Sequence, residues 1–139
     1  DGDAIVHFRS SNVVHMGDCF FNGMYPFIDL DSGGSVQGVL DAADRVLGMV
    51  DDRTSILPGH GERTDRAGLR AFRAMVAACR DRVRAAMAGG KTLEQVLAAK
   101  PTAEYDATWG GAKFMPPERF VGTLYRDATA RPEGTAGRK

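Results

Sequence analysis

Two short segments constrain the fold of this chain most. Residues 13–18 (VVHMGD) and 56–61 (ILPGHG) are both apolar, β-branched runs that end in a glycine-containing loop. Loops at strand ends are where a rigid scaffold displays chemical groups. The first loop presents Asp18 and the second presents His60, and both residue types ligate metals. The two segments therefore predict strands that end at one edge of a sheet, with Asp18 and His60 close enough to share an ion.

The metal site that these two residues predict is incomplete. A catalytic zinc normally takes at least three protein ligands, and the pattern supplies only two. Taken singly, each residue also has a simpler interpretation. Asp18 fits a turn aspartate that bonds its own backbone, and His60 fits a surface loop histidine. The glycines on either side of His60 favour the metal interpretation, because they let the backbone approach an ion closely.

Three other potential ligands fit a structural role better. His7 and His15 lie within predicted strands beside bulky apolar residues, as packed or edge-exposed histidines do. Cys19 directly follows Asp18, and neighbouring strand residues point to opposite faces, so we do not expect both to reach one ion. Cys19 and Cys79 are two unrelated thiols rather than a disulfide framework.

Apolar periodicity predicts an α/β chain. Strands come early, and helices lie between and after them, which indicates one sheet with helices on one face. The predicted strands span residues 4–9 and 12–16, joined as a hairpin at Ser10-Ser11, and 54–57, with a further extended candidate at 27–31. The predicted helices span 36–50 after a Ser35 N-cap, 65–88, a short helix from a Thr92 capping box to Pro101, and a last helix after Pro116-Pro117.

Composition excludes several classes of partner. The formal charge is zero, from 18 basic and 18 acidic residues, so no nucleic-acid or anionic membrane surface is indicated. No apolar run approaches the length of a membrane span. The sequence shows no signal peptide, but it is expected to begin within a domain. The composition and the absence of a long apolar run predict a soluble protein. The sequence leaves open whether its compartment is the cytoplasm or the periplasm.

The order of these elements resembles the C-terminal half of a metallo-beta-lactamase-fold hydrolase. The resemblance rests on Gly17-Asp18, on residues 33–35 (GGS) before a helix, and on residues 58–61 (PGHG) before another, and it covers residues 1–128. Residues 1–6 also resemble a stretch that follows a metal-binding histidine in that family. The family's upstream His-x-His-x-Asp-His cluster has no counterpart in this sequence.

The resemblance implies a hydrolase with a two-metal site. Asp18 would bridge the two ions and His60 would ligate the second, with zinc as the expected metal and iron or manganese as alternatives. The reaction would use metal-activated water on a small-molecule ester, thioester, lactone or phosphoester. A beta-lactam is less expected, because many true zinc beta-lactamases have cysteine or serine where this chain has Asp18. No residue of this chain is assigned a catalytic role with certainty, and the chain alone is expected to be inactive.

The fold implied is half of an αββα sandwich, formed by residues 1–129, followed by a tail at 130–139 that is expected to be disordered. The uncovered sheet face would need either the N-terminal half of the same fold or a second copy of this chain. The alternative is a non-catalytic half-domain that serves as a dimerisation or interaction module.

Two further features bear on ligand binding. Tyr25, Phe27 and Trp109 are candidates for walls of a substrate pocket, although core packing is the default for aromatic residues. Residues 33–35 could bind an anion through free N–H groups at a helix N-terminus. A tight loop that ends in a helix cap is the commoner interpretation of such a segment.

Overall fold

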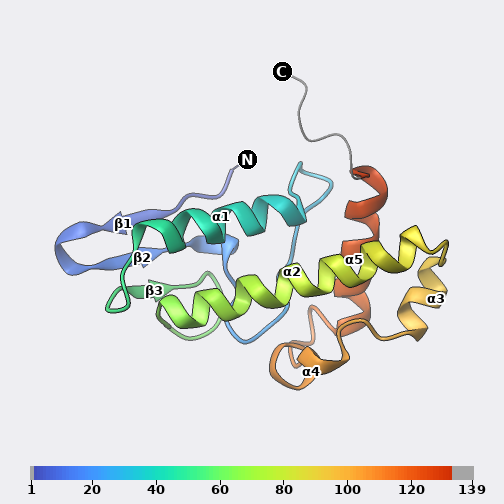
Figure 1. Ribbon diagram of the computed structural model, residues 1–139. Helices are drawn as coiled ribbons and strands as arrows, with labels where there is room; N and C mark the ends of the chain where they lie inside the picture. Colours follow the sequence, from blue (N-terminus) through green and yellow to red (C-terminus); the bar gives the residue numbers. More distant parts are fainter. Residues whose placement is uncertain (1, 133–139) are drawn as a thin grey trace.

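The computed structural model describes residues 2–132 and is a mixed α/β structure. Its strands are β1 (Val6–Phe8), β2 (Val13–His15) and β3 (Ser55–Leu57). Its helices are α1 (Val36–Met49), α2 (Arg66–Ala88), α3 (Leu93–Ala98), α4 (Ala103–Trp109) and α5 (Pro117–Ala130), with short 3₁₀ turns at Arg9–Ser11 and Gly17–Cys19. The sheet lies at one end of the molecule, and α3, α4 and α5 lie toward the other (Figure 1).

The three strands form one mixed sheet in the order β1-β2-β3. β1 and β2 are antiparallel, and they form the hairpin predicted from residues 4–16. Asn12 closes that hairpin with a left-handed backbone (φ 53°). β2 and β3 are parallel, with Val14 opposite Ile56. α1 connects these two strands. Because they are parallel, both of them end at the same edge of the sheet.

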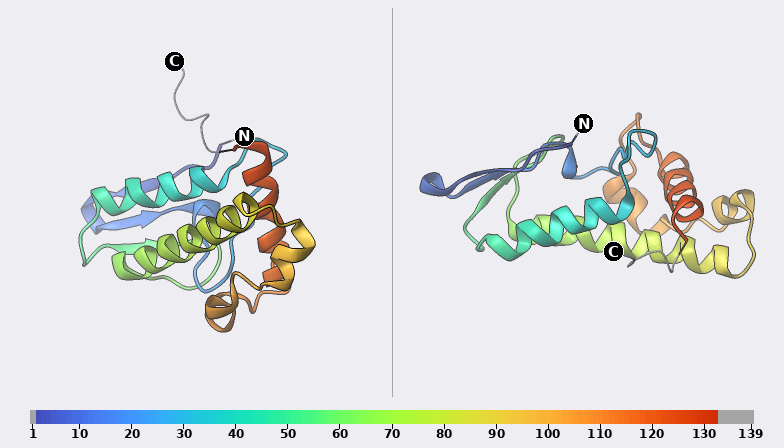
Figure 2. Two further views of the ribbon diagram at one scale, coloured as in Figure 1. Left: turned by 45° about the vertical axis from the view of Figure 1, so that its right-hand side comes forward. Right: turned by 90° about the horizontal axis from the view of Figure 1, so that it is seen from above.

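Helices cover one face of this sheet. α1 and α2 pack against each other and form a layer on one side of the strands, as the right-hand view of Figure 2 shows. Val14 and Ile56 point toward these helices and are completely buried. The opposite face carries Val6 and Phe8, whose exposed fractions are 46% and 51%. Within residues 2–132 no helix packs on that face, so a sheet with helices on one face agrees with the sequence prediction.

Side-chain caps begin three helices, of which the Ser35 cap and the Thr92 capping box were predicted. Ser35 accepts a hydrogen bond from the Gly38 N–H at the start of α1, and Asp65 accepts one from the Gly68 N–H at the start of α2. Thr92 and Gln95 form the reciprocal capping box at the start of α3. Side-chain oxygens at these positions satisfy backbone donors that have no partner within the helix.

Two elements differ from the sequence prediction. Residues 27–31 form no strand, because Asp29 closes a turn there: its carboxylate accepts from the Ser32 N–H and its carbonyl from the Gly34 N–H. Helix α4 was not predicted, because a helix of only seven residues shows too little apolar periodicity to detect. The tail predicted at 130–139 begins at the last residue of α5, and residues 133–139 lie outside the described part of the chain. None of the described helices is long and apolar enough to cross a membrane.

Replacing Asp65 by alanine should remove the N-cap of α2 and lower the free energy of unfolding by about 1 kcal/mol. The cause is the loss of the 3.0 Å hydrogen bond from the Gly68 N–H. Urea unfolding followed by circular dichroism measures this change. Asp65→Asn retains an acceptor at the same place and should stay close to wild type. Equal losses in the two variants would contradict the capping role.

Candidate metal site

The candidate site lies where β2 and β3 end. The loop after β3 is held against the loop after β2 by backbone hydrogen bonds. The Gly59 N–H donates to the Gly17 carbonyl at 2.7 Å and to the Phe20 carbonyl at 3.0 Å, and the Met16 N–H donates to the Leu57 carbonyl at 2.9 Å. These bonds fix the two loops relative to each other before any ligand is present. The carboxyl ends of parallel strands are a common position for binding sites.

The two loops bring Asp18 and His60 together, as the sequence predicted. The Nε2 atom of His60 lies 3.3 Å from an Oδ atom of Asp18. Two ligand atoms bound to one tetrahedral zinc, each at about 2.0–2.1 Å, lie about 3.4 Å apart. The observed spacing therefore fits two ligands of a single ion. Both side chains are about half exposed, at 51% for His60 and 55% for Asp18, so an ion can reach them.

Gly59 is the residue that makes this approach possible. A Cβ atom at this position would collide with the Asp18 carboxylate and with the backbone of Gly17. Gly61 faces a similar limit, because its φ of +92° suits glycine and a side chain there would meet the Asn22 carbonyl. The two glycines around His60 therefore allow close packing against residues 17–22, and their predicted role in approach to an ion stays a prediction.

Aromatic rings fix the orientation of His60. Phe21 is buried and stacks on the imidazole, with ring centroids 4.7 Å apart and planes 12° apart. The Asn22 N–H also donates to the His60 carbonyl at 2.9 Å, which holds the backbone on the same side. Phe114, from the loop after α4, lies 6.1 Å from the imidazole centroid and packs at a tilt. Phe114 was not predicted near His60, because it is distant in the chain and follows no recognisable motif.

A cleft opens beside Asp18. Its volume is about 460 Å³, and it extends from Asp18 to the loop that precedes α1. Its walls come from the N-terminal segment, the 3₁₀ turn after β2, the loop 27–35 and the start of α1. They comprise Asp3, Asp18, Cys19, Phe27, Ile28, Asp29, Ser32, Gly33, Gly34, Ser35, Gly38 and Val39.

Of the three aromatic residues considered for a pocket wall, Phe27 lines this cleft, whereas Tyr25 and Trp109 are core residues. The Tyr25 hydroxyl donates to an Asp106 carboxylate oxygen at 2.7 Å, and its ring stacks on Phe120. Burial, followed by the bond to Asp106, raises the pKa of Tyr25 far above its usual range. Trp109 packs in the core, and its carbonyl accepts from the Tyr25 N–H.

Two further potential ligands, His15 and Cys19, lie in the same segment as Asp18. The Nδ1 atom of His15 accepts a hydrogen bond from the Gly17 N–H at 3.0 Å, so His15 supports the loop that carries Asp18. Cys19 was not expected to reach the same ion as Asp18, because neighbouring strand residues point to opposite faces. That argument is wrong here, because residues 17–19 form a 3₁₀ turn rather than a strand. Cys19 lines the cleft, and burial together with Asp3 and Asp18 raises the pKa of its thiol. Among residues 2–132, no group of three or more His, Cys, Asp or Glu side chains could hold a metal.

Comparison with known proteins adds no assignment: no family model matches the chain, and neither does any curated protein.

Replacing Gly59 by alanine should distort the contact between the two loops and destabilise the protein by about 1–3 kcal/mol, as overpacking does. Chemical denaturation measures the loss, and the amide NMR signals of Gly17 and Asp18 should shift with it. Gly111→Ala is the matched control, because no atom lies within 4 Å of a Cβ there. If the two variants have equal stability, Gly59 is not required for the close approach.

Proposed function

We propose that this chain is the C-terminal, metal-binding part of a metal-dependent hydrolase with the metallo-beta-lactamase fold. The observation that carries the proposal is the 3.3 Å approach of the His60 imidazole to the Asp18 carboxylate at the ends of two parallel strands. Zinc is the metal we expect, with iron or manganese as alternatives. The substrate is a small molecule with a hydrolysable ester, thioester, lactone or phosphoester, and a beta-lactam is less expected.

In this proposal the chain's own residues hold and orient the ion. Asp18 offers carboxylate oxygens and His60 offers Nε2, while Phe21 keeps the imidazole plane fixed by stacking. The half-exposed position of both ligands leaves the remaining coordination positions open to further ligands. When bound, such an ion supplies an activated water at neutral pH and polarises the bond to be cleaved. The two ligands alone hold it weakly, and the isolated chain is therefore expected to show no appreciable hydrolysis.

The uncovered sheet face supports the idea that a second polypeptide segment completes the fold. Val6 and Phe8 stand on that face with Val13, and burial of apolar area stabilises by about 25 cal/mol per Å². β3 has its outer edge covered, because Ile56 and Thr64 exchange backbone hydrogen bonds, whereas within residues 2–132 β1 pairs only with β2. We expect the N-terminal half of the same fold or a second copy of this chain to cover this face.

A second candidate function follows from the same face. A half-domain without catalysis could use β1 and its exposed side chains as a dimerisation or interaction surface, because unpaired edge strands readily accept a partner. Metal content distinguishes the two functions. Zinc binding in titration that depends on Asp18 and His60 favours the hydrolase, and a stable dimer that binds no zinc favours the interaction module.

Titration with zinc, followed by calorimetry, should reveal one site whose affinity depends on both residues. Asp18→Ala and His60→Ala should each weaken zinc binding by about tenfold or more, equivalent to at least about 1.4 kcal/mol. His7→Ala is the control, because His7 lies in β1 and outside the pair. Zinc binding that is unchanged in Asp18→Ala and His60→Ala would rule out the proposed site.

The chain in isolation should have a mass above that of the monomer in light scattering, because the exposed face associates. Phe8→Ser should return it toward the monomer mass. Met49→Ser is the matched control, since this apolar side chain is similarly exposed, at 41%, but lies at the end of α1. A wild-type chain that stays monomeric at high concentration would argue against a partner on this face.

A further inference from the structure

His15 holds the turn that carries Asp18 through a side-chain hydrogen bond. The Gly17 N–H donates to the Nδ1 atom of His15 at 3.0 Å. An imidazole nitrogen accepts a hydrogen bond only while it carries no proton, so this bond requires a neutral ring whose proton is on Nε2. Protonation of His15 makes both ring nitrogens donors, and the bond to the Gly17 N–H is then lost.

The peptide group between Met16 and Gly17 is bonded at both of its polar atoms. Its N–H donates to His15, and its oxygen, the Met16 carbonyl, accepts from the Cys19 N–H at 3.2 Å. This second bond closes the 3₁₀ turn that contains Asp18. Because one planar group makes both bonds, loss of the bond to His15 frees that group to rotate, and its rotation opens the turn.

The same turn is in contact with the loop that carries His60. The Gly17 carbonyl accepts from the Gly59 N–H at 2.7 Å. Across this contact the Asp18 carboxylate and the His60 imidazole approach to 3.3 Å. Opening of the turn would change that spacing, so the protonation state of His15 is coupled to the positions of the two candidate ligands.

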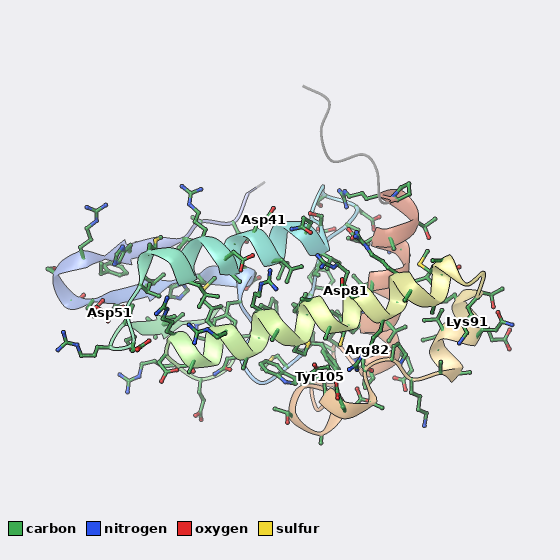
Figure 3. All side chains as sticks on the ribbon, viewed as in Figure 1. Asp41, Asp51, Asp81, Arg82, Lys91 and Tyr105 are labelled. Carbon is green, nitrogen blue, oxygen red and sulfur yellow. The ribbon has the colours of Figure 1, made fainter. Side chains whose placement is uncertain are left out.

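His15 is exposed on the open face of the sheet, and both residues that pair with it, Val6 and Leu57, are apolar. Helix α1, with its exposed Asp41, lies on the opposite face, and Asp51 lies at the opposite end of β2 (Figure 3). Residues 2–8, the turn after β2 and the loop 58–61 contain the titratable groups Asp3, His7, Asp18, Cys19 and His60. Histidine ordinarily changes charge between pH 5 and 8, so a test must separate His15 from the other two histidines.

From these contacts we infer that His15 is a pH-sensitive positioning residue for Asp18. The neutral ring holds the turn closed, and the protonated ring releases it. This switch of the turn stands on the hydrogen bonds alone, whereas its effect on a metal rests on the proposed function. Below neutral pH the turn would lose the spacing that fits one ion, and metal binding would fall more steeply than protonation of His60 alone explains.

Amide NMR of the full-length, metal-free chain with a chelator tests the switch between pH 8 and pH 5. The Gly17 signal should shift together with the ring signals of His15. In His15→Asn it should stay at its pH 8 position, because the Asn side-chain oxygen replaces Nδ1 as an acceptor that does not titrate. His7→Gln and His60→Gln are the controls and should keep the wild-type shift. A Gly17 signal that still shifts in His15→Asn, or that follows His7 or His60, would overturn the inference.

Zinc titration by calorimetry tests the effect on the metal site. At pH 8, His15→Asn should bind zinc as the wild type does, whereas His15→Leu should bind about fivefold more weakly, because it lacks the acceptor. At pH 6, His15→Asn should bind about threefold more tightly than the wild type, since both chains keep His60 and only one keeps His15. Equal zinc affinities of His15→Asn and His15→Leu at pH 8 would refute the effect of His15 on the metal.

Failure of this inference can be told apart from failure of the proposed function. A chain that binds zinc with the same affinity whatever residue replaces His15 refutes only the positioning role. A wild-type chain that binds no zinc refutes the proposed metal site. In that case the pH dependence of the Gly17 signal still decides whether His15 controls the turn.

Discussion

The parallel pairing of β2 with β3 organises the rest of the structure. Both strands are only three residues long, but α1 and α2 pack beneath them and bury Val14 and Ile56 completely. Because the strands run in the same direction, the loops that follow them meet. Gly59 then donates one N–H to two carbonyls of the facing loop, which fixes the separation of the loops. The positions of Asp18 and His60 follow from that pairing.

The same pairing explains the asymmetry of the molecule. A sheet of three short strands has little area, and two helices suffice to bury one of its faces. α3 and α5 pack against α2 beyond the sheet and extend the core away from the strands (Figure 1). The other face of the sheet keeps Val6 and Phe8 in solvent. The candidate metal site lies at the ends of β2 and β3. The loop after each strand carries one of its two residues.

The sequence predicted the parts of this structure that depend on local chemistry. Ser35 and Thr92 predicted two helix starts through their caps, because a cap acts within its own turn, and the start of a third helix was predicted near Asp65. The positions of Asp18 and His60 after two neighbouring strands were predictable, because each residue follows its own apolar run. The long-range contacts were not predictable in the same way. Phe114 reaches His60 from a loop more than fifty positions later, and Tyr25 is a core residue because Asp106 and Phe120 surround it. The patterns in a single sequence do not indicate contacts between residues that are distant in the chain.

Residues 126–131, in and just after α5, contact the loop that borders the cleft and the first turn of α1. Arg131 donates to the Gly34 carbonyl and Arg126 pairs with Asp31, while the buried Asp127 accepts from the first turn of α1. The loop that borders the cleft is thus braced by a helix that is almost a hundred residues away in the chain. Proteolytic trimming or a bulky fusion within the last turn of α5 would release this brace and loosen the cleft wall while leaving Asp18 and His60 untouched. In the proposed function, ligand binding in the cleft and metal binding at Asp18 and His60 would therefore depend on different sets of contacts.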